Sequence, residues 1–171
     1  MTDMTESTTM TTTMTPELIV GIDGSRESLG ALREGMRLAD ALGYRVRVIA
    51  AWSWPVGQGM GMTPPVFWDP ESDAREILTA ALASVKIPEG LVVTAEAVHG
   101  DAADVLIAAS ASARMLVTGS TGAGMARALL LGSVSTKCAQ RAACPVLVYR
   151  PMPEELAAGA TMAKDELVTA G

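Results

Sequence analysis

The sequence predicts a single-domain α/β protein with a doubly wound, five-stranded parallel sheet in the order 3-2-1-4-5. Short apolar runs alternate with segments of helical periodicity, which is typical of a parallel sheet covered by helices on both faces. Hydrophobic residues make up 49% of the 171 residues but aromatic ones only 4%. Aliphatic side chains of this kind suit strands that are buried on both faces. Short connections and right-handed crossovers favour the doubly wound arrangement.

Each element follows from a local signal. The apolar run at 18–22 predicts the first strand, and a helix over 26–41 follows, with Ser25 as its N-cap and Gly43 as its stop. The same reasoning predicts, in order, a strand at 45–52, a helix at 71–85, a strand at 91–98, a helix from Asp101 to about 112, a strand at 114–118, a helix at 133–142 and a strand at 145–149. The loop at 53–70 is rich in Pro and Gly, and a loop of this length is either functional or disordered.

The ends of the chain differ from its middle. Residues 1–15 are rich in Thr and Met and lack periodicity, so we expect a disordered leader, and the methionines within it leave the start of translation open. Residues 16–151 carry the alternating pattern and form the predicted domain. Residues 152–171 are expected to be a weakly ordered tail, with a short helix near 153–158.

The glycine-rich segment 119–133 is the strongest functional signal in the sequence. It follows an apolar strand directly, and it ends where a helix begins, so we expect Ser133 to be the N-cap of that helix. Glycine lets a backbone approach a ligand closely, and a helix N-terminus offers unpaired N–H groups to an anion. The segment therefore predicts a phosphate-binding loop, whose glycines are Gly119, Gly122, Gly124 and Gly132.

The predicted strand order places a carboxylate opposite this loop. The first strand ends at Asp23 and the fourth ends at Gly119, and ligands bind where the winding direction of such a sheet reverses. The Asp23 carboxylate can accept hydrogen bonds from a ribose hydroxyl or an amine, while the loop amides hold phosphates. An Asp-Gly-Ser sequence is also common in turns and caps, so a purely local role for Asp23 is the alternative.

Composition excludes several classes of function. A net charge of −6 with scattered Lys and Arg argues against nucleic acid or an anionic membrane as the main partner. No apolar run reaches bilayer length and no secretory signal is visible, so we expect a cytoplasmic protein. Cys138 and Cys144 have no metal-site spacing and are expected to be reduced, buried side chains. His99 is expected to be structural or to line the pocket rather than to act as a general base.

The chain resembles the nucleotide-binding universal stress proteins, whose fold is of the adenine nucleotide alpha hydrolase type. The motifs that carry the resemblance are Val20-Gly21-Ile22-Asp23-Gly24-Ser25, Val98-His99-Gly100-Asp101, Gly119-x-x-Gly122 followed after nine residues by Gly132-Ser133, and Cys144-Pro145-Val146-Leu147-Val148. Together they span roughly 17–150, which is the whole predicted domain.

The resemblance implies a role for each matching position. Asp23 would contact the adenine or ribose, and the backbone near Ala50 and Ala51 would meet the base. Ribose and phosphates would be held by Gly119, Gly122, Gly124, Gly132, Ser133, Val134 and Ser135. Thr121 stands where many relatives have a basic residue or His, so Arg127 is either a substitute phosphate contact or a solvated side chain. The implied ligand is ATP, with or without Mg²⁺.

The sequence favours binding over catalysis. No Gly-Lys-Ser/Thr follows the glycines, and no paired carboxylates or Ser/His/Asp arrangement can be assembled around them. We therefore expect at most slow ATP hydrolysis, with nucleotide occupancy as a regulatory or stability signal. The alternative is a nucleotide-free dimeric interaction module of the same fold, and a flavodoxin-like carrier is disfavoured by the Gly-Ser spacing. In both readings we expect a homodimer through the strand at 145–149, whose apolar edge needs a cover.

Overall fold

The computed structural model describes residues 15–54, 68–121 and 131–151. Five parallel strands form one sheet in the order β3-β2-β1-β4-β5, which confirms the predicted fold class. The elements are β1 (Glu17–Gly21), α1 (Arg26–Leu42), β2 (Arg45–Trp52), α2 (Pro70–Ala83), β3 (Val93–His99), α3 (Ala102–Ser110), β4 (Met115–Gly119), α4 (Ser133–Arg141) and β5 (Val146–Tyr149). The predicted leader, almost all of the predicted tail and most of the loop at 53–70 lie outside the described residues.

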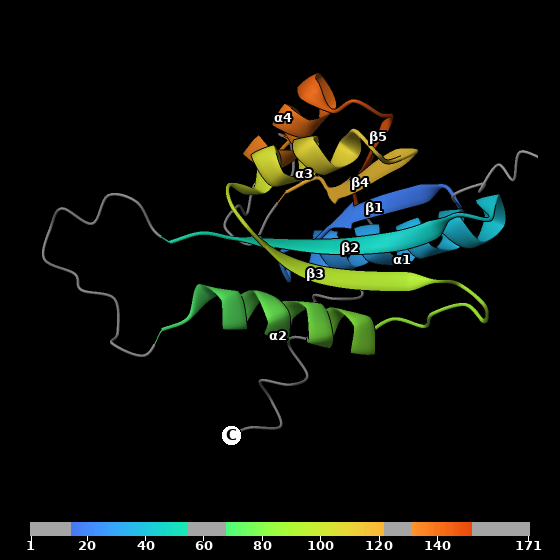
Figure 1. The fold of residues 1–171 in the computed structure, drawn as a ribbon, viewed down its shortest axis with the longest axis horizontal. Helices are drawn as coiled ribbons and strands as arrows, with labels where there is room; N and C mark the ends of the chain where they lie inside the picture. The colour runs from blue at the N-terminus through green and yellow to red at the C-terminus, as the bar shows by residue number, and fades with distance from the viewer. Residues whose placement is uncertain (1–14, 55–67, 122–130, 152–171) are drawn as a thin grey trace, which may run out of the picture.

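Helices cover both faces of the sheet. Helices α1 and α2 pack on one face and α3 and α4 on the other, with α4 lying beside α3 (Figure 1). Strand β1 sits at the centre of the sheet, and β3 and β5 form its two edges. The chain reverses its winding between β1 and β4, so the carboxyl ends of these two strands flank the switch point of the sheet.

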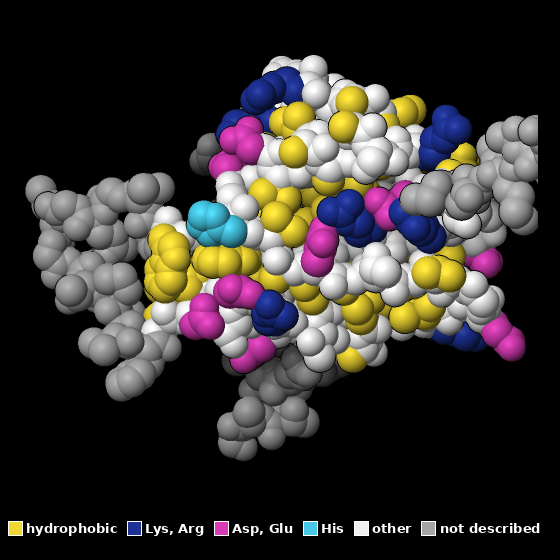
Figure 2. All heavy atoms as spheres, viewed as in Figure 1, with side chains coloured by type: hydrophobic (Ala, Val, Ile, Leu, Met, Phe, Trp, Pro, Cys, Tyr) yellow, Lys and Arg dark blue, Asp and Glu magenta, His cyan; other side chains and the backbone are white. Residues whose placement is uncertain are grey.

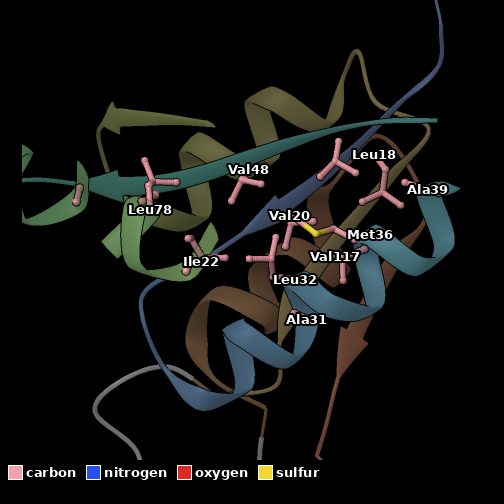
Figure 3. Packing of buried hydrophobic residues seen from close by; sticks show 14 residues of the cluster. Leu18, Val20, Ile22, Ala31, Leu32, Met36, Ala39, Val48, Leu78 and Val117 are labelled. Carbon is pink, nitrogen blue, oxygen red and sulfur yellow. The ribbon is translucent and has the colours of Figure 1, made fainter. Parts of the chain in front are cut away.

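The larger core lies between the sheet and α1 with α2. Leu32 and Met36 of α1 pack against Val20, Val48 and Val117 of the three central strands (Figure 3). All five side chains are buried, and the burial of each aliphatic side chain is worth roughly 1.5–3 kcal/mol. A second, smaller core under α3 and α4 fixes these helices over the other face. The two cores hold the strand ends in place on both sides of the switch point.

Three of the described helices begin with a side-chain cap, and the fourth does not. Ser25 accepts a hydrogen bond from the Ser28 amide, as predicted, and Asp69 and Asp101 cap α2 and α3 in the same way. The prediction that Ser133 caps α4 is wrong, because Gly132 occupies the N-cap position. A glycine has no side chain to accept from the first turn, so α4 has no side-chain cap hydrogen bond.

Other differences from the sequence prediction are small. The first strand ends one residue earlier than predicted, and α2 begins at Pro70, which fits the first turn because proline lacks an N–H. The bounds of β2 agree with the prediction. Strand β5 lies at an edge of the sheet, as expected, with its residues half-buried in the single chain. In the described parts of the chain, no helix has the length and apolar character needed to cross a bilayer.

Candidate functional site

A cavity of about 310 Å³ opens at the switch point of the sheet. This volume lies at the lower end of the range of ~300–1,000 Å³ that is usual for small-molecule sites. Among the described residues, its wall is formed by Gly21, Ile22, Asp23, Ser28, Ile49, Ala51, Ala102, Leu106, Thr118, Gly119, Thr121, Gly132, Ser133, Val134 and Ser135. The ends of β1 and β4, the amino end of α4 and part of α3 therefore meet around one space. The predicted pairing of Asp23 with the start of the glycine-rich segment is found there.

The amino end of α4 forms one wall of this cavity. The Gly132 amide donates a 2.7 Å hydrogen bond to the Ser120 carbonyl oxygen, which fixes the start of α4 beside the end of β4. The buried Ser135 hydroxyl lies 3.0 Å from the Gly132 carbonyl oxygen, to which it donates. Ser133 is exposed and Val134 half-buried, and both line the cavity. The first N–H groups of a helix have no intrahelical partner, so this wall offers a positive dipole end to the cavity.

Asp23 combines a local role with a place at the cavity. Its carboxylate accepts hydrogen bonds from the Ser25 amide at 3.0 Å and the Ser25 hydroxyl at 2.6 Å. This is the turn that precedes α1, so the local role suggested by Asp-Gly-Ser is real. Asp23 nevertheless lines the cavity, and its backbone amide donates a 3.3 Å hydrogen bond to the Ser28 hydroxyl oxygen. The turn therefore fixes the position of the carboxylate at the cavity.

Two glycines of the site lie where helices pack closely against the strand ends. A Cβ atom at Gly119 would lie 2.9 Å from the backbone carbon of Glu27 and 3.0 Å from the Ser28 amide nitrogen. A Cβ atom at Gly21 would lie 2.6 Å from Leu106 Cδ1. These glycines let the first turn of α1 and the side of α3 approach the strand ends closely. The sequence predicts Gly119 to be a position where a ligand can approach the backbone. In the structure this glycine also allows α1 to pack closely against the end of β4.

One part of the cavity wall is apolar. Ile22, Ile49, Ala51 and Leu106 contribute it, and Ile49 and Leu106 also belong to the smaller core. Ala51 lines the cavity as the family resemblance implies. Ala50 does not line it, because successive strand residues face opposite sides and its side chain lies in the larger core. A flat apolar group could pack against this wall while its polar end faces α4.

The structure leaves part of the predicted site undescribed and adds residues to the rest. Gly122, Gly124 and Arg127 lie outside the described residues. Cavity-lining residues that the sequence analysis did not assign are Gly21, Ile22, Ser28, Ile49, Ala102, Leu106, Thr118 and Thr121. Proximity to Asp23 and Gly119 in the sequence could have suggested Ile22, Thr118 and Thr121. No local signal marks Ile49 or Leu106, because Ile49 is placed by the pairing of β2 with β1 and Leu106 by the packing of α3 on the sheet.

The other candidate reactive groups do not line the cavity. The His99 ring packs against Trp52 with ring centroids 4.6 Å apart, beside exposed hydrophobic side chains (Figure 2). Burial raises the pKa of the Cys138 thiol, with a smaller contribution from the Asp101 charge, and burial also raises the pKa of Cys144. The described residues contain no group of three His, Cys, Asp or Glu side chains that could hold a metal ion.

Comparison with known proteins identifies the family to which this sequence is similar. Residues 14–150 match the model of the universal stress protein family. A universal stress protein of Mycolicibacterium smegmatis is 37% identical over 140 residues, which cover 77% of this chain and 47% of that protein. A universal stress protein of Mycobacterium tuberculosis is 33% identical over 137 residues, covering 77% of this chain and 46% of that protein. The chain spans about half the length of these curated relatives.

Solved structures agree on the fold. A universal stress protein in complex with cAMP superposes with a TM-score of 0.61 at 24% identity, over 80% of this chain and 98% of that one. The universal stress protein of Archaeoglobus fulgidus in complex with dAMP gives a TM-score of 0.56 at 22% identity, over 80% and 98%. At this level of identity the likeness concerns the fold. With the family model covering most of its length, the chain belongs to the universal stress protein family.

Proposed function

We propose that this protein binds an adenine nucleotide, ATP with or without Mg²⁺, in the cavity between β1, β4 and α4, and that occupancy acts as a regulatory or stability signal. The observation that carries the proposal is the amino end of α4, which lacks a side-chain cap and opens into the cavity. An uncapped helix N-terminus suits a phosphate group, because its N–H groups and dipole both favour negative charge. Structures of family members are reported with cAMP, dAMP and AMP bound, which supports an adenine nucleotide as the ligand.

The residues around the cavity fit the parts of such a ligand. The wall of Ile22, Ile49, Ala51 and Leu106 suits a base, and Asp23 offers a carboxylate for a ribose hydroxyl or an exocyclic amine. Gly119, Gly132 and Ser133 face the phosphate side. Mg²⁺ would then be held chiefly by the phosphates, as it is in many nucleotide sites. A ligand of this kind stabilises the folded protein by mass action, which gives occupancy a physical consequence.

We propose binding rather than catalysis. Asp23 is the one titratable side chain among the described residues that line the cavity. Phosphoryl transfer needs a positioned nucleophile together with charge stabilisation on the transferred group, and these residues offer neither a base such as His nor a Lys or Arg. The expected result is that ADP does not accumulate when stoichiometric ATP is incubated with the protein for hours. Multiple turnovers abolished by D23N would contradict this part of the proposal.

A change of charge at Ser133 tests the phosphate assignment. S133E places a carboxylate at the first position of α4, where it suits the helix dipole and should leave the folded protein at least as stable. The same charge should repel phosphates and raise the Kd for ATP at least tenfold, because like charges near a protein surface interact by about 4 kcal/mol at 4 Å. S133Q is the matched neutral control. Equal ATP affinity of S133E, S133Q and the wild type would show that the phosphates lie elsewhere.

The dimeric, nucleotide-free interaction module remains the competing proposal. It rests on β5, which lies at an edge of the sheet and is half-buried in the single chain. Dimerisation through this edge is compatible with nucleotide binding as well, so oligomeric state alone does not separate the two. Absence of ATP binding by a folded dimer would favour the module. We also propose a cytoplasmic location, on the grounds of composition given above.

A further inference from the structure

In the described part of the chain, the buried hydroxyl of Thr118 differs from those of three buried serines. Ser28, Ser110 and Ser135 each donate to a backbone carbonyl oxygen, at distances of 2.9, 2.6 and 3.0 Å. Thr118 is 3% exposed, and its Oγ1 atom has no hydrogen-bond partner among the described residues. The Nε atom of Arg45 also lacks a hydrogen bond, but it lies 2.9 Å from a Glu17 carboxylate oxygen. Among the described residues, Thr118 is therefore the one whose buried side-chain polar atom has neither a hydrogen bond nor an ion pair.

An unpartnered buried hydroxyl needs an explanation. In the unfolded chain it bonds to water, and folding removes those bonds without replacing them. Valine has nearly the same shape, suits a strand equally well, and occupies the position before it, Val117, and the paired position on β5, Val148. A threonine at this point thus costs stability that a valine would not.

The place of Thr118 in the fold suggests what the hydroxyl bonds. Its side chain lies on the same face of β4 as Leu116 of the smaller core, two residues further toward the carboxyl end, and it lines the cavity. The next residues along the cavity wall are Gly119 and Thr121. The 2.7 Å bond between Gly132 and Ser120 sets the amino end of α4 beside this end of β4. Thr118 therefore belongs to the polar side of the cavity.

We propose that the Thr118 hydroxyl is a hydrogen-bond partner of the sugar–phosphate part of the bound nucleotide. This residue then lowers the stability of the nucleotide-free protein and raises its affinity for the ligand. The inference rests on the proposed nucleotide site, since it names a further contact within it. A hydroxyl can both donate and accept, so either a ribose hydroxyl or a phosphate oxygen satisfies it. Ligand binding then supplies the bond that the folded protein lacks.

The substitution T118V tests the proposal with two measurements: the stability of the nucleotide-free protein should rise, and the affinity for nucleotide should fall. Without nucleotide, T118V should melt about 2–4 °C higher than the wild type, because it removes an uncompensated polar group. Its Kd for ATP and AMP should rise roughly 5- to 10-fold, which lies within the usual range for one lost hydrogen bond. T118S keeps the hydroxyl and should bind within about threefold of the wild type. Titration with adenosine distinguishes a ribose contact from a phosphate contact. A comparable loss of adenosine affinity in T118V assigns the bond to the ribose, and an unchanged adenosine affinity assigns it to a phosphate.

The outcomes separate this inference from the proposed function. Failure of the wild type to bind ATP at millimolar concentration would overturn the nucleotide site itself. Wild-type binding with equal affinity in T118V would leave the site standing and overturn the role of Thr118. T118A removes the same hydroxyl without adding bulk, so a comparison of T118A with T118S gives the same decision if T118V does not fold. A drop in affinity shared by T118S and T118V would also overturn the hydroxyl contact.

Discussion

The Gly132 amide donates a 2.7 Å hydrogen bond to the carbonyl oxygen of Ser120. This contact joins the end of β4 to the start of α4 across the segment that carries the remaining glycines. It holds the uncapped end of α4 at the switch point of the sheet, where the cavity opens. The position of the cavity wall at the amino end of α4 is therefore set by backbone pairing at the two ends of the segment.

Gly119 should be intolerant of a side chain for reasons of packing. A Cβ atom there would press on the backbone of Glu27 and Ser28 in the first turn of α1. We expect G119A to lower the free energy of unfolding by about 1–3 kcal/mol, measured by urea denaturation. T121A, two residues further along the same cavity wall, serves as the control and should cost much less. A G119A protein as stable as the wild type would show that the turn relaxes freely.

A buried glutamate at the amino end of the sheet should contribute more to the stability of the fold than an exposed glutamate does. Glu17 is 8% exposed, and its carboxylate lies 2.9 Å from Arg45 Nε and 3.5 Å from Arg47 Nη1. We expect E17A to cost about 1–3 kcal/mol of stability, because both guanidinium groups lose a partner near the strands. The control is E34A, which breaks the exposed pair with Arg37 and should cost less than about 0.5 kcal/mol. Similar losses in the two variants would contradict this account.

The two thiols predict a loss of stability in alkaline solution. Burial raises the pKa of Cys138 and of Cys144 in the folded protein. Below the ordinary thiol pKa of about 8.5, both folded and unfolded chains carry protonated thiols and nothing is lost. Above it the unfolded chain ionises first, so the free energy of unfolding should fall as pH rises further. The slope between pH 8 and 10 should be shallower in the double variant C138A/C144A than in the wild type, and equal slopes would exclude this contribution.

Strand β5 predicts a dimer that a single proline can disrupt. The carbonyl oxygens of Pro145 and Tyr149 accept hydrogen bonds from the amides of Leu116 in β4 and of Ser120 just after it, so by alternation the Val148 N–H points away from the sheet. V148P removes this outward donor and leaves the pairing with β4 in place. In sedimentation equilibrium at micromolar concentration we expect a dimer for the wild type and a monomer for V148P with unchanged circular dichroism. A monomeric wild-type protein would refute pairing through this edge.

The sequence predicted the fold well because its signals were local and redundant. The run at 45–52 alternates around a fully apolar centre, and Ser25 and Asp101 stand directly before helical periodicity, so those elements need no tertiary information. The N-cap of α4 was misplaced by one residue, because a glycine N-cap carries no side-chain signal while the serine after it does. Element type was thus more predictable than the residue that begins an element.

The site could be predicted only where it follows the strand ends. Asp23 follows the end of β1 and Gly119 ends β4, so topology alone brought them together. Leu106 reaches the cavity because α3 packs on Gly21, and that approach depends on a contact between elements far apart in the sequence. The uncompensated hydroxyl of Thr118 could not be foreseen either, since it is defined by partners that are missing around it.

The proposed binding site for an adenine nucleotide is the cavity beside the uncapped end of α4. The most direct measurement is isothermal titration of ATP into protein from which any co-purified nucleotide has been extracted and identified. We expect saturable binding with one nucleotide per chain, and weaker binding in S133E than in S133Q. No heat of binding up to millimolar ATP, in a protein whose circular dichroism and melting show that it is folded, would contradict it.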